Sequence, residues 1–199
     1  IMPVGAKSFS KAMQFGSETY HALEGLLKKK GMHTNVGKEG SFASSLNSNE
    51  KAIELIISAI EEAGYVAGKD ISITIDAAAS EFFENGKYFF KTENKTLSAQ
   101  KLGEYYEGLV KKYPIISLED PFAERAWGNW RSFTAAVRGR CQVVGDDVFV
   151  TKVERIQKGV AEGAATAVVI KPNQIGTVTE TLQAMAATHA AGWQAVVSH

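Results

Sequence analysis

The sequence has almost no cysteine, no excess of charge of either sign and no long apolar run. Its 199 residues include a single cysteine, Cys141, so an internal disulfide is excluded and a reducing compartment is favoured. The 22 basic and 22 acidic side chains balance, which argues against a nucleic-acid binder. No apolar stretch approaches the ~18 residues of a membrane span, and residues 1–10 lack a secretory pattern. We therefore expect a cytoplasmic protein without nucleic-acid or membrane partners.

The apolar pattern predicts helices first and then an alternation of strands and helices. Helices are expected over 8–30 and 50–63, with a loop over 35–49 that is rich in Gly, Ser and Asn. Asn85-Gly86 between aromatic flanks predicts a β-hairpin. Short strands are expected over 1–4, 71–75, 115–118, 142–144, 167–170 and 194–197, with helices over 98–112, 126–137, 153–162 and 177–191. Such alternation is typical of a parallel α/β sheet.

Each strand in the second part of the chain ends in a residue that can bind or transfer charge. Asp76, Glu119, Asp146 and Lys171 follow four successive strands, and Ser198 with His199 follows the fifth. In a parallel barrel all carboxyl ends of strands face the same mouth, where active sites form. One acidic residue after a strand is as often a helix cap as a ligand, but three at equivalent positions favour a shared site.

The neighbouring acids are expected to play a supporting part. Asp120 and Asp147 follow Glu119 and Asp146 directly, and adjacent residues of an extended strand face opposite sides. We therefore expect Asp120 and Asp147 to cap or brace the backbone. Lys171 extends the apolar strand 167–170, and a lysine in that position usually reaches into a polar cavity.

The constellation of acids and one lysine suits a particular chemistry. Three carboxylates around one basin are typical ligands for Mg²⁺. A neutral lysine beside such an ion can take a proton from a carbon next to a carboxylate, the combination known from the enolase superfamily. Glu39, in the loop Gly37-Lys38-Glu39-Gly40-Ser41, is a candidate acid for the leaving group, although spacing alone does not single it out.

Several motifs in a fixed order resemble those of the enolase family along essentially the whole chain. They are IMPVGAKSF, NVGKEGSFA, DAAASEFF, SLEDPF, VVGDDVFVT, IKPNQIGTVTET and VVSH. The resemblance implies an enolase-type TIM-like α/β barrel, preceded in the family by an α+β domain. It also implies reversible, Mg²⁺-dependent dehydration of 2-phosphoglycerate to phosphoenolpyruvate in glycolysis, by proteins that are at least dimeric.

The resemblance also implies a role for each matching position. Asp76, Glu119 and Asp146 match the carboxylates that bind Mg²⁺, and Lys171 matches the base that removes the C2 proton. Glu39 matches the acid that assists loss of the 3-hydroxyl. The pair Ser198 and His199 matches the start of a loop that closes on the substrate.

The chain departs from the family pattern in one loop and at its ends. Lys38 stands where the family usually has Asp, Ser41 where it has Gly, and Ser44 and Ser45 replace Pro-Asn. A positive charge beside Glu39 favours its ionised form, which is unsuited to a general acid. We expect residues 1–199 to be a partial barrel domain with about six of eight strands, lacking the N-terminal domain and the last strand. The alternatives are an inactive enolase-like binding module or scaffold and, less favoured by the motif around Lys171, a sugar-acid dehydratase.

Overall fold

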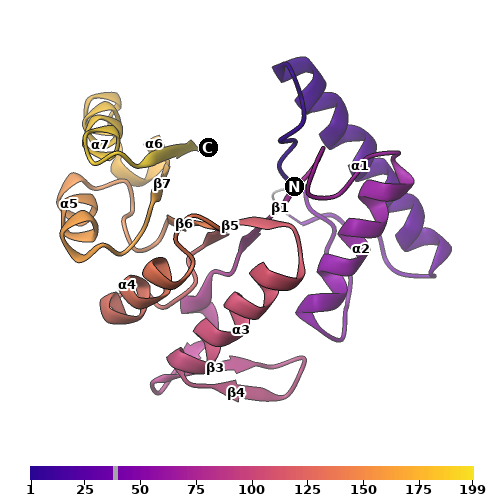
Figure 1. Ribbon diagram of the computed structural model, residues 1–199, viewed down its shortest axis with the longest axis horizontal. Coiled ribbons are helices and arrows are strands. Elements are labelled where there is room, and N and C mark those ends of the chain that lie inside the picture. Colours follow the sequence, from indigo (N-terminus) through magenta and orange to yellow (C-terminus); the bar gives the residue numbers. More distant parts are fainter. Residues whose placement is uncertain (38–39) are drawn as a thin grey trace. The chain divides into compact units, whose positions relative to one another are not determined.

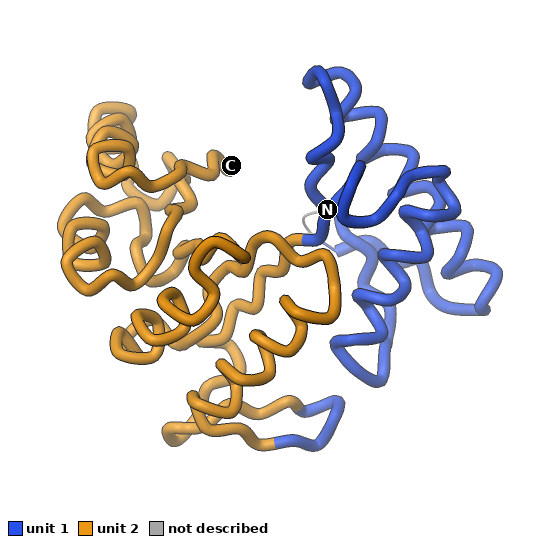
Figure 2. The backbone as a smooth tube through the Cα atoms, in the orientation of Figure 1, with its two compact units in different colours: residues 1–73, 91–95 blue, residues 74–90, 96–199 orange. Residues whose placement is uncertain are grey.

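The computed structural model describes residues 1–37 and 40–199, which fall into two compact units (Figures 1 and 2). Unit 1 comprises residues 1–73 and 91–95, and unit 2 comprises residues 74–90 and 96–199. In the described part of the chain, no helix is long and apolar enough to cross a membrane.

Unit 1 is built on two helices, α1 (Phe9–Lys29) and α2 (Asn49–Glu62), which pack against each other (Figure 1). Each begins at a serine, Ser8 or Ser48, whose hydroxyl accepts a hydrogen bond from a backbone N–H of the first turn. Both helices were predicted. The strand expected over 1–4 is reduced to a single antiparallel bridge between Met2 and Ser72.

Unit 2 contains the predicted parallel sheet of five strands, in the order β1-β5-β6-β7-β8 (Figure 1). The strands are β1 (Ile73–Asp76), β5 (Ile115–Glu119), β6 (Gln142–Gly145), β7 (Ala167–Ile170) and β8 (Gln194–Val197). The intervening helices are α3 (Ala99–Lys112), α4 (Trp127–Ala136), α5 (Val153–Glu162) and α7 (Val178–Ala190). The order of strands follows the chain, as expected for consecutive β/α units, and the α/β class is confirmed.

A second, smaller sheet is inserted after β1. A 3₁₀ turn, η1 (Ala79–Phe82), leads into β2 (Phe83–Glu84), β3 (Lys87–Phe90) and β4 (Lys95–Leu97), which pair in that order. Asn85 and Gly86 both have positive φ, 50° and 80°, as a tight hairpin turn requires. The predicted hairpin is confirmed, whereas β4 and the short helix α6 (Pro172–Ile175) were not predicted.

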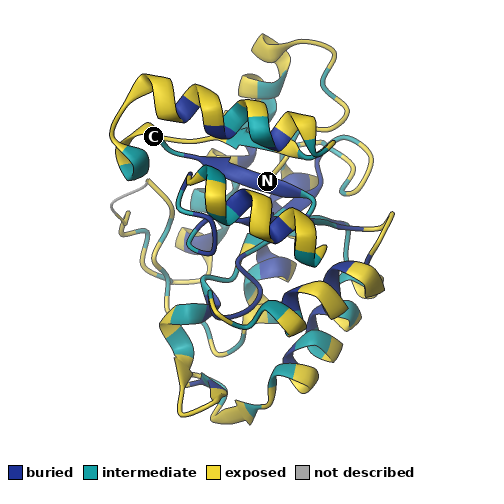
Figure 3. Cartoon of the chain, turned by 90° about the vertical axis from the view of Figure 1, so that its left-hand side faces the viewer, coloured by how far each residue is buried: buried dark blue, intermediate teal, exposed yellow. Residues whose placement is uncertain are grey.

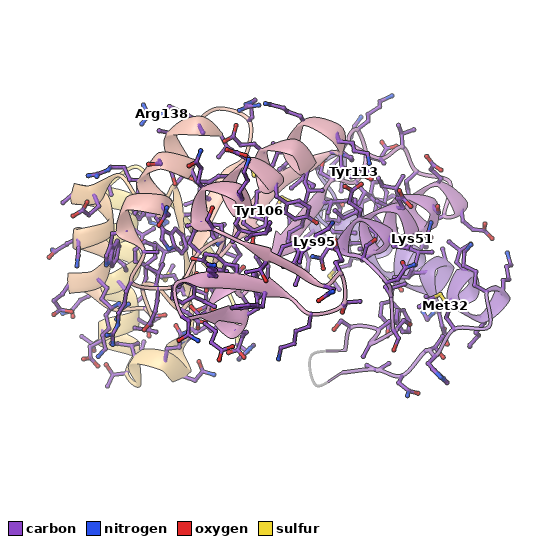
Figure 4. The ribbon with its side chains drawn as sticks, turned by 90° about the horizontal axis from the view of Figure 1, so that it is seen from below. Met32, Lys51, Lys95, Tyr106, Tyr113 and Arg138 are labelled. Carbon is purple, nitrogen blue, oxygen red and sulfur yellow. The ribbon has the colours of Figure 1, made fainter. Side chains whose placement is uncertain are left out.

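The core of unit 2 has an aliphatic and an aromatic part. All four residues of β7 are buried, and Val144, Ala167 and Val169 form an aliphatic cluster that Val196 joins. Figure 3 shows the buried residues on the strands and on the inward sides of the helices. The aromatic part joins the hairpin to α3 and α4 and includes Tyr88, Tyr106, Phe122 and Phe133, with Tyr106 labelled in Figure 4.

The helix α4 carries three aromatic residues, of which Trp130 and Phe133 are buried and Trp127 is half-buried. Nearby, the ring of Phe149 fits between two glycines, Gly145 of β6 and Gly159 of α5. A Cβ atom at either glycine would overlap this ring, so these positions require glycine for close approach rather than for backbone freedom.

Candidate active site

The carboxyl edge of the five-stranded sheet gathers the charged residues predicted from the sequence. Asp76 and Glu119 are the last residues of β1 and β5, and Asp146 and Lys171 directly follow β6 and β7. Because these four strands are neighbours in one parallel sheet, their ends lie along one edge. The topology thus brings three acids and one lysine to the same side of the fold.

Lys171 and Asp146 form the central pair of this edge. The Lys171 Nζ donates a hydrogen bond to Asp146 Oδ2 at 2.6 Å. The side chains of Lys171 and Asp146 are only 18% and 10% exposed. Forming a pair so far withdrawn from water carries a desolvation cost, and removing one partner would leave the other as an uncompensated buried charge.

Asp120 braces the backbone beneath the site, as its position after Glu119 indicated. Its Oδ1 accepts from the N–H of Asp146 at 3.0 Å, and its Oδ2 accepts from the N–H of Asp147 at 2.8 Å. The Asp120 N–H donates to the carbonyl of Val144 at 3.0 Å. Asp120 therefore ties the end of β5 to the end of β6 and fixes where the Asp146 side chain begins.

The acids of this edge raise one another's pKa values. Burial, and then the charges of Asp76, Asp120 and Asp146, raise the pKa of Glu119 to about 8, against the opposing effect of Lys171. Burial raises the pKa of Asp120 to about 7, although the N–H groups of Asp147 and Asp146 lower it. The site carries more negative charge than its single lysine balances.

Asp76 lies at the more open end of the same charge cluster. Loss of water around the carboxyl group raises its pKa although the residue as a whole is exposed, and the charges of Asp146 and Asp147 add to this shift. The N–H of Ala78, which donates to Asp76 Oδ1 at 2.9 Å, and the charge of Lys171 act in the opposite direction.

The donor chemistry of the edge fits a hard divalent cation. Carboxylate oxygens are the ligands that Mg²⁺ prefers, and a cation would favour the ionised forms of Asp76 and Glu119, whose pKa values are raised by burial and then by the neighbouring acids. Among the described residues, however, no group of three or more Asp, Glu, His or Cys side chains is gathered closely enough to hold an ion. The acids thus share an edge, with Asp146 engaged by Lys171, rather than forming a closed cage.

Two polar residues of this region, Thr151 and Gln174, were not singled out from the sequence. Gln174 Nε2 donates to Asp146 Oδ1 at 2.7 Å, and the Thr151 hydroxyl donates to Gln174 Oε1 at 2.7 Å. Both residues lie within motifs that carry the enolase resemblance, VVGDDVFVT and IKPNQIGTVTET. That membership was the available signal, since neither residue type suggests a role by itself.

Two of the remaining predicted site residues, Ser198 and His199, directly follow the last strand. The Ser198 N–H donates to the carbonyl of Ile170 at 3.0 Å, and a ring nitrogen of His199 lies 3.3 Å from Asn173 Nδ2. Ser198 and His199 thus contact residues on either side of Lys171 in the sequence, namely Ile170 and Asn173. Glu39, the predicted acid, lies outside the residues that the structure describes.

The parallel sheet with acids and one lysine along its carboxyl edge defines an α/β-barrel-type domain with a charged site at its strand ends. Residues 1–199 match the family model described as "Enolase, C-terminal TIM barrel domain". The chain therefore belongs to the enolase family.

A comparison with curated proteins agrees with this assignment. The chain is similar to a protein named Enolase from Acidothermus cellulolyticus (strain ATCC 43068 / DSM 8971 / 11B), with 50% identity over 199 residues. The alignment covers 100% of this chain and 46% of that protein. The chain thus spans a little under half the length of the curated relative that it matches.

Proposed function

We propose that the protein is an enolase that interconverts 2-phosphoglycerate and phosphoenolpyruvate, with Lys171 as the base. The observation that carries this proposal is the Lys171–Asp146 pair, with Nζ and Oδ2 2.6 Å apart at the carboxyl edge of the sheet. Glu119 and Asp76 end the two strands beyond it. A cation held by these carboxylates would favour the unprotonated amine of Lys171, which could then take a proton beside a carboxylate group.

We propose that Asp76, Glu119 and Asp146 would hold Mg²⁺ in the working enzyme. The ion supplies positive charge that stabilises the negative charge developing on the substrate carboxylate. Asp120 supports this arrangement because it fixes the backbone from which Asp146 projects. The negative charge of the edge, seen in the raised pKa of Glu119, supports a cation of this kind.

The reaction divides into two steps at two kinds of group. In the first, the unprotonated Nζ of Lys171 takes the C2 proton, and the electron pair of the C–H bond moves into the carboxylate group. In the second, an acid protonates the 3-hydroxyl, the C3–O bond breaks, water leaves and the electron pair forms the double bond. Resemblance assigns the acid to Glu39, and assigns contacts with substrate to Ser198 and His199.

The wider setting of the function follows from the same resemblance. We propose a cytoplasmic enzyme of glycolysis that assembles as a homodimer or larger homo-oligomer. Sedimentation of the purified protein would test the assembly, and a single monomeric species at micromolar concentration would contradict it.

The activity is tested by following phosphoenolpyruvate formation from 2-phosphoglycerate and Mg²⁺ in the purified protein. Lys171→Ala is expected to lower the rate by at least about 10²-fold, because the base is lost. Lys111→Ala, which changes an exposed lysine at the end of α3, is the matched control and should keep the rate of the unchanged protein.

The outcomes separate the two leading functions. Turnover that requires Lys171, and that a chelator abolishes and Mg²⁺ restores, supports an enolase. Absence of turnover in a folded protein, together with binding of 2-phosphoglycerate detected by calorimetry, would instead support the alternative of an inactive binding module.

A further inference from the structure

A closed ring of hydrogen bonds surrounds the two central residues of the candidate site. The Lys171 N–H donates to Thr151 Oγ1 at 3.0 Å, and Thr151 donates through the same oxygen to Gln174 Oε1 at 2.7 Å. Gln174 Nε2 donates to Asp146 Oδ1 at 2.7 Å, and Lys171 Nζ donates to Asp146 Oδ2 at 2.6 Å. The ring therefore starts at the backbone of Lys171 and ends at its side chain.

The polar atoms of this ring hold one another in place. The Thr151 hydroxyl donates to Gln174 at 2.7 Å and accepts from the Lys171 N–H, while the Val169 carbonyl, at 3.5 Å, is a more distant second acceptor. The carboxamide of Gln174 then presents its N–H to Asp146, because its oxygen is already engaged. Both oxygens of Asp146 are used, one by Gln174 and the other by Lys171, which fixes the plane of the carboxylate.

The backbone at Thr151 adopts a conformation that its residue type disfavours. Val150 and Thr151 have φ of 44° and 55°, in the left-handed region where β-branched residues are genuine outliers. Such strain persists where the surrounding structure holds it and is concentrated at functional sites. Here the carbonyl of Asp146 accepts from the N–H groups of Phe149 and Val150, at 3.0 and 2.7 Å, so the strained turn is anchored on Asp146 itself.

Burial gives the ring its stiffness. Thr151 is completely buried and Asp146 is 7% exposed, so water does not compete freely for their hydrogen bonds. Gln174 is half-buried on the short helix α6, which directly follows Lys171. The strained turn after β6 and the helix after β7 thus meet through the hydrogen bond from Thr151 to Gln174, next to the Asp146 carboxylate and Lys171.

We propose that Thr151 and Gln174 are positioning residues, which fix the Asp146 carboxylate and the Lys171 amine in one relative orientation. The inference has two parts. The first, that Thr151 and Gln174 restrain the Lys171 side chain, does not depend on the proposed function, whereas the second, that this restraint speeds turnover, rests on the proposed function. The experiment therefore needs one readout for each part.

The first readout is the rate at which an amine-selective acylating reagent labels Lys171, followed by mass spectrometry without metal or substrate. Thr151→Val removes the hydroxyl but keeps the β-branched shape, and Gln174→Ala removes the carboxamide. Both are expected to raise labelling of Lys171 about fivefold, the change produced by losing one hydrogen bond. Labelling of the exposed Lys111 in the same sample serves as the internal reference.

The second readout is the steady-state rate with 2-phosphoglycerate and Mg²⁺. Thr151→Val and Gln174→Ala should lower kcat on the order of 10- to 100-fold and leave KM within about twofold, because misplacing a reacting group mainly affects the chemical step. Thr151→Ser retains the hydroxyl and should restore both the labelling rate and kcat. Thr179→Val on the exposed side of α7 is the matched control and should change neither.

The outcomes distinguish the two proposals. Faster labelling in Thr151→Val and Gln174→Ala, reversed in Thr151→Ser, supports the positioning role even if the unchanged protein shows no turnover, a result that would count against the proposed function alone. Unchanged labelling and unchanged kcat in both folded variants would overturn the positioning role. Equal losses in Thr151→Val and Thr151→Ser would also overturn it, since the hydroxyl would then be irrelevant. Tryptophan fluorescence confirms folding in each variant.

Discussion

The ion pair of Lys29 and Glu62 in unit 1 lies at the surface, whereas Asp120 and Asp146 at the candidate site of unit 2 are withdrawn from water. Lys29 Nζ and Glu62 Oε1 are 2.6 Å apart in unit 1, with side chains 67% and 46% exposed. Asp120 and Asp146 of unit 2 are 4% and 7% exposed. Burying a carboxylate costs folding free energy unless hydrogen bonds or opposite charge offset the loss of water.

The buried acids of the candidate site therefore make an unfavourable electrostatic contribution to the folding of unit 2, which the exposed pair of unit 1 does not make. Unit 2 offsets it with a dense core, in which Trp130, Phe149 and all of β7 are buried. Destabilised, polar sites on rigid scaffolds are common where a protein needs reactivity. We therefore expect the stability of unit 2 to fall at alkaline pH and to respond to divalent cations.

The distribution of tryptophan allows the two units to be followed separately. All three tryptophans, Trp127, Trp130 and Trp193, lie in unit 2, so their fluorescence reports on that unit. Far-ultraviolet circular dichroism reports on the helices of both units.

The largest effect is expected from filling the space between strand and helix in unit 2. Gly159→Ala would force a Cβ atom into the ring of Phe149 and should lower the free energy of unfolding by ~1–3 kcal/mol. The matched change in unit 1 is Gly25→Ala in α1, where nothing lies within 4 Å of the new atom. It should stabilise the helix by ~0.5–1 kcal/mol, since alanine is the better helix former. Denaturant titrations would measure both, and equal effects in the two units would contradict the comparison.

The second effect is a loss of stability of unit 2 as the pH rises. The pKa of Glu119 is raised from 4.5 to about 8, so the folded state keeps a proton that the unfolded chain releases within this interval. Stability from this group is complete below the unfolded pKa and is lost as the pH rises through about 8. Asp120, with a pKa of about 7, acts in the same direction. The Tm followed by fluorescence should fall by several degrees toward alkaline pH.

Glu119→Gln serves to assign this pH dependence. The variant cannot ionise, so its Tm should change less with pH and should exceed that of the unchanged protein on the alkaline side. Mg²⁺ should raise the alkaline Tm of the unchanged protein more than that of Glu119→Gln, because the ion binds the folded state through the acids. Identical pH profiles for the two proteins would refute the role given to Glu119.

Smaller effects on the free energy of unfolding are expected at two buried tyrosines, and the two effects should have opposite signs. The Tyr106 hydroxyl is buried and has no hydrogen-bond partner among the described residues, so Tyr106→Phe should stabilise unit 2 by about 1 kcal/mol. The Tyr88 hydroxyl accepts from the N–H of Ala123 at 3.1 Å. Tyr88→Phe should therefore destabilise by about 1 kcal/mol. Calorimetric Tm values moving in the same direction for both variants would be inconsistent with these assignments.

The smallest effect is expected at the surface of unit 1. Lys29→Ala breaks the exposed pair with Glu62 and should change the free energy of unfolding by less than about 0.5 kcal/mol, because water screens such pairs. Circular dichroism would follow it, and a loss above ~1 kcal/mol would show that this pair acts like the buried groups of unit 2.

The sequence specified most of the fold because its periodicity coincides with packing. The strand over 167–170 is a continuous apolar run and is fully buried, and the glycine and asparagine of the hairpin have the positive φ that the turn needs. Where packing is weaker the prediction was less accurate. Residues 1–4 make one bridge rather than a strand, and α6 was missed because a helix of four residues, the first of them a proline, is too short to show a helical period.

The charged residues of the site and the bracing role of Asp120 could be predicted, but the parts played by Thr151 and Gln174 could not. Asp76, Glu119, Asp146 and Lys171 each end a strand, and that position is visible in the sequence. Thr151 meets Lys171 and Gln174 across 20 and 23 residues, respectively, through a turn that its residue type disfavours. These contacts join residues far apart in the sequence and need a backbone conformation that threonine disfavours. The pattern of apolar residues therefore does not predict them, and the three-dimensional structure is needed to find them.

The slot that holds Phe149 has a consequence for engineering the protein. Its ring is seated between the glycines of β6 and α5, and the strained turn that carries Thr151 begins three residues before it, at Asp146. Truncating this side chain leaves a dry, aromatic-sized void of the kind that takes up benzene. A small apolar molecule bound in this void would again support the turn that carries Thr151. Adding or removing that molecule would then change how firmly the Asp146–Lys171 pair is held.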